Sequence, residues 1–379
     1  MIRTLQIGND WFEDRQGGLS RFYSELLRHF PATQIEVEGL VAGTDKAQIS
    51  SGGRVVAFAL ADEPIAIRLL HARQAALTIL HNQKIDIIAS HFALYALPIL
   101  DKLRSIPSVV HFHGPWAAEA GVEGSSFISS RIQAAIERAV YSHANRVIVL
   151  SRAFQQELVR SYGISEELIR VVPGGVDLER FNITLTRGEA RERLGWPIDR
   201  PIILAVRRQM RRMGLENLID ASRALIMTNP DLLVFLAGSG PISNELKLRI
   251  AEYGLDKSIR LLGRVDDADL PLAYRAADLT VVPSQTLEGF GMITLESLAS
   301  GTAVFVSPIG GLPEVIGPFA PQCVFDGTSA KEIQVALAEA LCGQRSLPTA
   351  EECRQYASKN FSWPVIAERI HAVYQEALS

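Results

Sequence analysis

Residues 282–301 read VPSQTLEGFGMITLESLASG. The stretch leaves a β-branched, strand-like run and enters a loop that contains Gly289 and Gly291. We expect a helix to start near Gly291 and to end at Gly301, because glycine commonly follows the last residue of a helix. The first backbone amides of a helix have no intrahelical partner, and glycines leave them accessible. This turn therefore predicts a pocket for an anion such as phosphate.

Two carboxylates in this stretch, Glu288 and Glu296, are eight residues apart. If both were helical, they would lie about two turns, or roughly 12 Å, apart. With Glu288 in the loop and Glu296 in the helix, they could bind two parts of one elongated ligand. Ribose and hexose suit them, because a carboxylate accepts two hydrogen bonds. The alternative is a surface acid and a solvated helix residue, and the neighbouring glycines favour the ligand.

Short apolar runs alternate with amphipathic stretches of helical length on both sides of this segment. The expected strands are residues 2–8, 35–41, 55–60, 85–89, 108–112 and 146–150 in the first half, and 201–206, 232–237, 259–262, 279–282, 303–306 and 323–325 in the second. Such alternation indicates βαβ crossovers and mostly parallel sheets that are covered on both faces. The predicted fold class is α/β, with two Rossmann-like doubly wound domains that face each other across a cleft. Ligands of such sheets bind beyond the carboxyl ends of the strands.

A polar segment punctuated by glycine and proline, residues 182–200, separates the two halves. Such a composition is typical of a connection between domains. We therefore expect a first domain at residues 1–185 and a second at 195–360. An amphipathic helix at residues 363–379 is expected to pack back on the first domain.

Composition excludes several classes of protein. The chain has 379 residues, of which 47% are hydrophobic and 21% charged, so disorder is excluded as its main state. A net charge of −4 argues against a polycation that binds nucleic acid. The three cysteines form no C-x-x-C pair, which excludes a disulfide scaffold and gives no zinc-ligand spacing. No apolar run is long enough to span a membrane, and the N-terminus reads as a buried strand rather than a signal peptide, so the expected compartment is the cytoplasm.

Arginines and glycines follow other strands of the second half. The turn after Val206 contains Arg207, Arg208, Arg211 and Arg212. Guanidinium groups match phosphate oxygens in pairs, whereas the alternative is a solvated basic turn. Gly238 and Gly240 follow the strand at 232–237 and leave room for a ligand, although a G-x-G pair by itself is weak evidence.

The first half offers polar and aromatic residues at its strand ends. Gly17 and Gly18 precede a helix and bring backbone amides toward a ligand, or they form an ordinary tight turn. The strand 108–112 ends before His113, and we expect His111 and His113 not to face the same way, which argues against a two-histidine metal site. His113 would enter the cleft, whereas His111 is expected to pack in the core. Trp116 offers a stacking face to a sugar ring.

These motifs together resemble the family-4 retaining glycosyltransferases, which have the GT-B fold. The resemblance covers essentially the whole chain, and the E-x7-E pair from Glu288 to Glu296 is its most specific part. It implies that Glu288 and the backbone near Phe290 hold the sugar of a nucleotide-diphosphate donor, and that Glu296 binds the ribose. The donor-binding residues that it implies are Gly238, Gly240, Glu288, Gly289, Phe290, Gly291, Met292 and Glu296, and the acceptor-side residues are Gly17, Gly18 and Trp116.

The catalytic residues implied by the resemblance are His113, Arg208, Arg212 and Glu288. The family usually places an Arg and, five residues later, a Lys on the diphosphate. Arg208 matches the Arg, but Met213 stands at the Lys position, and Arg212 is the residue expected to replace the missing charge. The family needs neither a metal nor a cofactor.

The predicted activity is transfer of a hexosyl group, with retention, from a UDP- or GDP-linked sugar to a hydroxyl acceptor, in polysaccharide, glycolipid or other glycoconjugate biosynthesis. Two alternatives stay open: a catalytically silent subunit that binds sugar nucleotides, which Met213 motivates, and a sugar-nucleotide epimerase of the same fold. The acceptor is expected to be a sugar, a lipid-linked sugar or another small hydroxyl compound. Residues 65–81 and 125–143 carry arginines at positions 68, 73, 131 and 138, which suggests peripheral contact with the inner face of the membrane.

Overall fold

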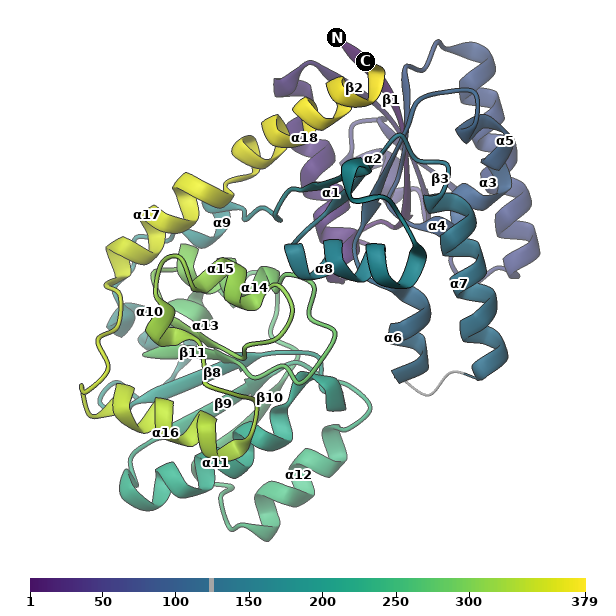
Figure 1. Cartoon of the computed structure of the whole chain (residues 1–379). Helices are drawn as coiled ribbons and strands as arrows, with labels where there is room; N and C mark the ends of the chain where they lie inside the picture. Colours follow the sequence, from purple (N-terminus) through teal and green to yellow (C-terminus); the bar gives the residue numbers. More distant parts are fainter. Residues whose placement is uncertain (123–125) are drawn as a thin grey trace. The chain divides into compact units, whose positions relative to one another are not determined.

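The computed structural model describes residues 1–122 and 126–379, and the chain forms two compact units (Figure 1). Unit 1 contains Met1–Gly175 and Trp363–Ser379, and unit 2 contains Val176–Ser362. Each unit is an α/β structure built on a parallel sheet.

Unit 1 has a sheet that, among its described residues, consists of seven parallel strands in the order β3-β2-β1-β4-β5-β6-β7. These strands are β1 (Ile2–Asp10), β2 (Ile35–Ala42), β3 (Val55–Ala59), β4 (Ile87–Ser90), β5 (Ser108–Phe112), β6 (Arg146–Val149) and β7 (Ile169–Val171). The α-helices are α1 (Gly18–His29), α2 (Lys46–Ser50), α3 (Ile65–Asn82), α4 (Ala93–Ala96), α5 (Leu100–Leu103), α6 (Trp116–Val122), α7 (Phe127–Tyr141), α8 (Arg152–Glu157) and α18 (Trp363–Leu378). Short helical turns are η1 (Phe30–Thr33), η2 (Leu97–Ile99), η3 (Leu158–Tyr162) and η4 (Glu166–Leu168).

Unit 2 has a five-stranded parallel sheet in the order β10-β9-β8-β11-β12, as far as the described residues go. The strands are β8 (Ile202–Val206), β9 (Leu233–Ala237), β10 (Ile259–Gly263), β11 (Leu279–Val282) and β12 (Val304–Val306). The helices are α9 (Leu178–Phe181), α10 (Arg187–Leu194), α11 (Leu215–Thr228), α12 (Ser243–Glu252), α13 (Leu270–Ala276), α14 (Met292–Ala299), α15 (Leu312–Ile316), α16 (Ala330–Leu341) and α17 (Ala350–Phe361), with the turns η5 (Arg211–Met213) and η6 (Pro321–Cys323).

The inner strands of both sheets are mostly buried, as sheets covered on both faces require. All five residues of β5 and all five of β9 are buried, and these strands consist mostly of apolar side chains. In each sheet the strand order reverses once, between β1 and β4 in unit 1 and between β8 and β11 in unit 2. Loops diverge at such a switch point and open a crevice at the carboxyl ends of the strands, where ligands bind.

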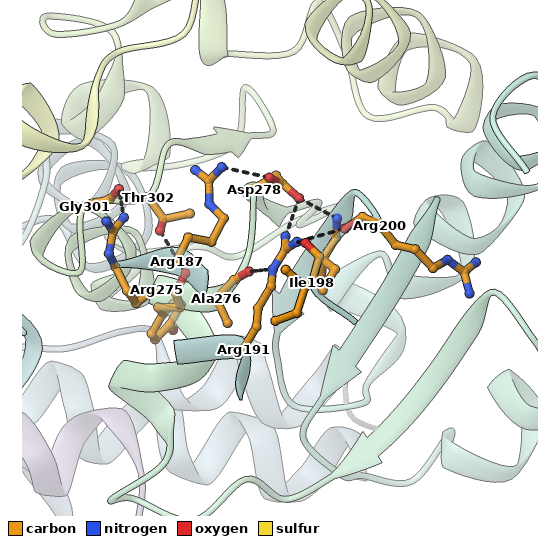
Figure 2. A network of polar contacts seen from close by, with 11 residues as sticks. Arg187, Arg191, Ile198, Arg200, Arg275, Ala276, Asp278, Gly301 and Thr302 are labelled. Carbon is orange, nitrogen blue, oxygen red and sulfur yellow. Dashed lines mark hydrogen bonds and ion pairs between the residues drawn. The ribbon is translucent and has the colours of Figure 1, made fainter. Parts of the chain in front are cut away.

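The first crossing between the units lies at Gly175–Val176, about ten residues before the position expected from sequence. Residues 176–200 belong to unit 2 because their side chains are tied to it. Figure 2 shows the guanidinium groups of Arg187 and Arg191 directed at Asp278. The ion pairs have N–O distances of 2.9 Å for Arg187 and 2.7 Å for Arg191. Buried Arg191 also donates to the carbonyl oxygens of Ala276, Ile198 and Arg200. The polar segment at residues 182–200 is therefore not a free linker, because its arginines hold it on unit 2.

The C-terminal helix α18 belongs to unit 1, together with the first sheet. Trp363 and Tyr374 are buried there, and the indole of Trp363 leaves no space for a side chain at position 175, because a Cβ on Gly175 would lie 2.5 Å from the ring. Glu376 accepts hydrogen bonds from Arg146 and Arg170 of strands β6 and β7. Helix α18 thus closes the first sheet with residues from the far end of the sequence.

The helical segment between β4 and β5 is divided into α4, η2 and α5, because Pro98 lacks a backbone N–H and interrupts the α-helical hydrogen bonds. One predicted strand differs from the observed structure. The strand expected at residues 323–325 is the end of turn η6 followed by a single bridge between Val306 and Val324.

The basic stretch expected from residue 125 to 143 corresponds largely to α7. Ser125, at which that stretch begins, lies outside the described residues, and Ser126 caps the helix by accepting from the amide of Ser129 at 3.2 Å. In the part of the chain that the structure describes, no helix combines the length and apolarity that crossing a membrane requires.

Candidate functional site

The loops that follow β8, β9, β11 and β12 form one rim on unit 2, joined by backbone hydrogen bonds. The amide of Gln285 donates to the carbonyl of Arg212 at 2.8 Å, and the amide of Gly311 donates to the carbonyl of Glu288 at 3.1 Å. Close packing of the rim depends on glycine. A Cβ on Gly310, which has a φ of +58°, would lie 1.7 Å from the carbonyl oxygen of Glu288. The rim is therefore a compact scaffold at the switch point of the sheet.

Glu288 lies at the centre of this rim and is largely buried. Its carboxylate accepts from the hydroxyl of Ser284 at 2.9 Å and forms an ion pair with the guanidinium of Arg207. The side chains of Arg207 and Glu288 are only 7% and 12% exposed. The pair joins the loop after β8 to the loop after β11, on the two sides of the switch point.

The arginine turn is arranged differently from the sequence-based expectation. Arg208, expected on the diphosphate, is exposed, and its side chain makes no hydrogen bond or ion pair that can be seen within residues 1–122 and 126–379. Arg207, the residue before it, points inward instead, and its Nη2 contacts Glu288, Ser284 and the sulfur of Met213. Arg212 is buried and donates to the carbonyl of Leu287 at 3.2 Å. Adjacent side chains at a strand end diverge, so only packing decides which arginine is buried.

Helix α14 follows Glu288 directly and begins after Gly291, whose φ of +75° favours glycine. A Cβ at Gly291 would also lie 2.4 Å from the Leu312 side chain. Glu296 is buried on this helix and accepts from the hydroxyl of Tyr274 at 2.9 Å. Both carboxylates of the E-x7-E pair are therefore held by protein donors, which fixes their orientation.

The remaining expected donor-side residues lie on the same rim. Gly289 and Met292 are half-buried, and Phe290 is buried with its ring centroid 6.1 Å from that of Phe361. Gly238 and Gly240 could not be replaced without clashes, because a Cβ on each would lie about 2 Å from the backbone of the arginine turn, at 2.0 Å for Gly238 and 2.3 Å for Gly240. These two glycines allow the loops after β8 and β9 to touch.

Unit 1 has its own polar cluster at the carboxyl ends of β4 and β5. The rings of His91, His111 and His113 stack, with centroids 4.1 Å apart for His91 and His111 and 5.4 Å apart for His91 and His113. The expectation that His111 and His113 face different ways is wrong. Residues two apart in an extended chain share one face, and both rings lie against His91. His111 is buried in the core, as expected, with its Nε2 2.8 Å from the Tyr374 hydroxyl.

Burial sets the charge of these rings. It holds the pKa of His91 and of His111 well below the ordinary value of 6.5, and it lowers the pKa of His113 to about 3. The three rings are therefore neutral near neutral pH. In the described residues, no group of three or more His, Cys, Asp or Glu side chains is arranged to hold a metal ion.

The acceptor-side residues expected from sequence lie around the ends of β1 and β5. Gly17 and Gly18 are exposed at the start of α1, and a side chain at Gly18 would meet nothing within 4 Å. Trp116 is half-buried at the start of α6, where its ring lies 5.1 Å from that of Phe92. The indole is thus partly packed against protein.

Sequence reasoning did not single out Ser284, His91 or Glu137, and it did not predict that Arg207 pairs with Glu288. Arg207 and Ser284 hold Glu288, and His91 contacts His113. Glu137, completely buried on α7, accepts from the amides of Trp116 and Ala117, the first residues of α6. Ser284 is four residues from Glu288, but the other partners are 20 to 81 positions apart, so no local pattern marks them.

Two family models match the chain. The family described as "Glycosyltransferase Family 4" matches residues 16–180, and the family described as "Glycosyl transferases group 1" matches residues 186–360. Together they account for both units.

Curated relatives and solved structures agree with this match. The D-inositol 3-phosphate glycosyltransferase of Corynebacterium kroppenstedtii is 32% identical over 254 residues, which are 64% of this chain and 55% of that protein. The chain thus aligns with little more than half of that relative. The enzyme of the same description from Corynebacterium glutamicum is 27% identical over 388 residues, covering 96% and 92% of the two chains. Anabaena Alr3699/HepE, solved with UDP and glucose, shares the fold with a TM-score of 0.77 at 20% identity, over 98% of both chains.

Proposed function

Because the chain belongs to the family-4 glycosyltransferases, we propose that it transfers a hexosyl group from a nucleotide-diphosphate sugar to a hydroxyl acceptor, with retention of the anomeric configuration. The observation that carries this proposal is the buried Glu288, held by Arg207 and Ser284 directly before a glycine-opened helix at the switch point of unit 2. Carboxylates accept hydrogen bonds from sugar hydroxyls, and a helix N-terminus attracts a phosphate.

The donor is bound along the rim of unit 2. Glu288 and the backbone of residues 289–292 hold the hexose, the first turn of α14 and the arginine turn hold the diphosphate, and Glu296 holds the ribose. The base is uracil or guanine, and the UDP in the Anabaena structure supports the former. The oriented carboxylates favour this division, since protein donors hold both of them and a carboxylate has about four lone-pair sites in all.

Departure of the nucleotide diphosphate is the step that most needs assistance. Arg208, Arg212 and the amides at the start of α14 stabilise the negative charge that grows on the leaving phosphate, a kind of interaction that typically contributes about 3–4 kcal/mol per donor. Because these groups supply positive charge, the reaction proceeds without a metal ion or cofactor. The leaving phosphate accepts the proton of the acceptor hydroxyl, which attacks from the same face of the sugar, and His113 orients a sugar hydroxyl.

The acceptor is a hydroxyl compound bound by unit 1: a sugar, a lipid-linked sugar or another small alcohol on the route to a polysaccharide, glycolipid or other glycoconjugate. The surface of helix α7 favours a cytoplasmic protein that acts at the inner face of the membrane. Phe127, Ile128 and Ile132 are exposed on it, and Arg131 lies over the ring of Phe127 at 5.5 Å. Apolar and basic side chains on one helix suit an anionic lipid surface.

Nucleotide binding is the first test. We expect UDP or GDP to raise the thermal stability of the protein, because a ligand at 100 times its dissociation constant adds about 2.7 kcal/mol. A thermal-shift series with UDP, GDP, ADP and the corresponding monophosphates identifies the base and the need for the second phosphate. Absence of a shift with every nucleoside diphosphate would contradict the proposal.

Two variants separate donor binding from chemistry. We expect Glu296→Ala to raise the dissociation constant of the donor about tenfold to a hundredfold, because it removes hydrogen bonds to a charged acceptor that contribute about 1.5–3 kcal/mol. Arg208→Ala should mainly slow transfer, by about tenfold, since this arginine is exposed and solvent screens its charge. Steady-state kinetics with a labelled donor measure both effects, and equal, near-wild-type constants for the two variants would reject the assignment.

A second candidate is a catalytically silent subunit that binds sugar nucleotides. Met213, at the position where the family usually has Lys, is buried against Arg207 and supplies no charge. Incubation with labelled sugar nucleotides distinguishes the candidates. Slow hydrolysis of the donor supports a transferase, tight binding without turnover supports the silent subunit, and inversion at C2 of the sugar supports an epimerase.

A further inference from the structure

A chain of hydrogen bonds in unit 1 leads from the backbone of β2 to His113. The Thr4 hydroxyl lies 2.9 Å from the carbonyl oxygen of Glu36, and the amide nitrogen of Gln6 lies 3.0 Å from the Thr4 hydroxyl. The other end of the Gln6 amide lies 3.0 Å from Nε2 of His91, and Nδ1 of His91 lies 3.2 Å from Nε2 of His113. The chain passes the switch point between β1 and β4.

The direction of every hydrogen bond in this chain follows from the first one, between Thr4 and Glu36. A carbonyl oxygen only accepts, so the single proton of the Thr4 hydroxyl is donated to Glu36. Thr4 must then accept from Gln6, which turns the NH₂ group of Gln6 toward Thr4 and its oxygen toward His91. Since that oxygen only accepts, Nε2 of His91 carries a proton.

Because both rings are neutral, the protonated nitrogen of His113 can be assigned as well. Burial keeps the pKa of His91 well below 6.5, so the ring has one proton and its Nδ1 is a bare acceptor. His113 must therefore donate through Nε2. Burial also lowers the pKa of His113 to about 3, so this ring has no second proton and its own Nδ1 is bare. Nδ1 of His113 has no hydrogen-bonding partner among the residues that the structure describes.

We propose that His91 is a positioning residue that fixes His113 as the Nε2–H tautomer, so that His113 presents Nδ1 as a hydrogen-bond acceptor to a hydroxyl group of the sugar substrate. His113 then orients a hydroxyl by accepting its proton and does not act as a cationic donor. This role toward a sugar rests on the proposed function, whereas the tautomer does not.

Nuclear magnetic resonance of the full chain, labelled with ¹⁵N-histidine, tests the tautomer directly. The chain has eight histidines, so the His113 signals are assigned by their loss in His113→Gln. We expect a protonated Nε2 and a bare Nδ1 for His113 in the unaltered protein near neutral pH. A His113 ring protonated on Nδ1, or on both nitrogens, would overturn the proposal before any variant of His91 is made.

Two substitutions test the role of His91. His91→Leu removes the acceptor, and His91→Asn keeps an amide oxygen near the former Nδ1. We expect the leucine variant to show a mixture of His113 tautomers and about a tenfold lower kcat with little change in the KM for the donor, and we expect the asparagine variant to restore both. A leucine variant whose His113 signals are unchanged would overturn the proposal.

If the leucine variant does not fold, Gln6→Met tests the same chain of hydrogen bonds one step earlier and should likewise give mixed His113 tautomers. The expected tautomer in a protein that transfers no sugar would refute the proposed function and leave the chain of hydrogen bonds intact.

Discussion

Arg207→Met should lower kcat/KM for transfer by about a hundredfold to a thousandfold and destabilise unit 2. The substitution leaves the carboxylate of Glu288 buried without its cation, and breaking a buried ion pair on one side costs about 3–5 kcal/mol. The ion pair also orients Glu288, which is proposed to hold the donor sugar, because Arg207 and Ser284 both donate to its Oε2. Steady-state kinetics measure the loss of kcat/KM, with the donor that the thermal-shift series identifies. A denaturation curve measures the loss of stability.

Arg211→Met is the matched control for this experiment. Arg211 lies in the same turn, but its side chain is 69% exposed, and its partners are the exposed Glu245 at 2.7 Å and the half-buried Glu216 at 3.5 Å. Exposed ion pairs contribute about 0–1 kcal/mol, so this variant should retain activity and stability. The double variant R207M/E288Q should regain stability without activity, because it removes both buried charges. Near-wild-type transfer by Arg207→Met would contradict the role given to the pair.

Glu137→Ala should destabilise unit 1 by roughly 3 kcal/mol or more, because it leaves several buried donors without a partner. The buried Glu137 carboxylate accepts four hydrogen bonds, from the amides of Trp116 and Ala117 at 2.9 and 3.2 Å and from the hydroxyls of Tyr141 and Tyr162 at 3.1 and 2.8 Å. Alanine leaves these donors buried without a partner, and each such group costs about 1–3 kcal/mol where no water or rearrangement satisfies it. The midpoint of urea denaturation, read with a probe in unit 1, measures the loss.

The same substitution at a surface glutamate supplies the comparison. Glu376 forms ion pairs with two arginines, but its side chain is 41% exposed, so Glu376→Ala should cost less than about 1 kcal/mol. Equal shifts in the denaturation midpoint for the two variants would show that Glu137 is not the structural anchor proposed. If Glu137→Ala loses more transfer activity than its lower stability accounts for, the start of α6 also positions His113 and Trp116.

Most of the fold follows from local sequence patterns. Alternation of apolar runs with amphipathic stretches predicts two parallel α/β sheets, and the turn from Glu288 to Gly291 predicts a strand, a glycine loop and a helix, all of which the structure contains. The spacing of Glu288 and Glu296 is likewise a local pattern, and it is the most specific part of the family resemblance. These signals are local because the period of a strand or helix and the backbone freedom of glycine depend on near neighbours.

Tertiary structure decided which side chains work together. Arg207 and Arg208 are adjacent and chemically identical, yet only Arg207 is buried, because Ser284 and Met213 surround it. The histidine expected to stand apart from its neighbour stacks with it on His91, and the segment expected to link the domains is held on unit 2 by Asp278. Such partners are 6 to 91 positions apart in the sequence. The order of strands in a sheet brings them together, and hydrogen bonds and ion pairs depend on distance in space rather than distance along the chain.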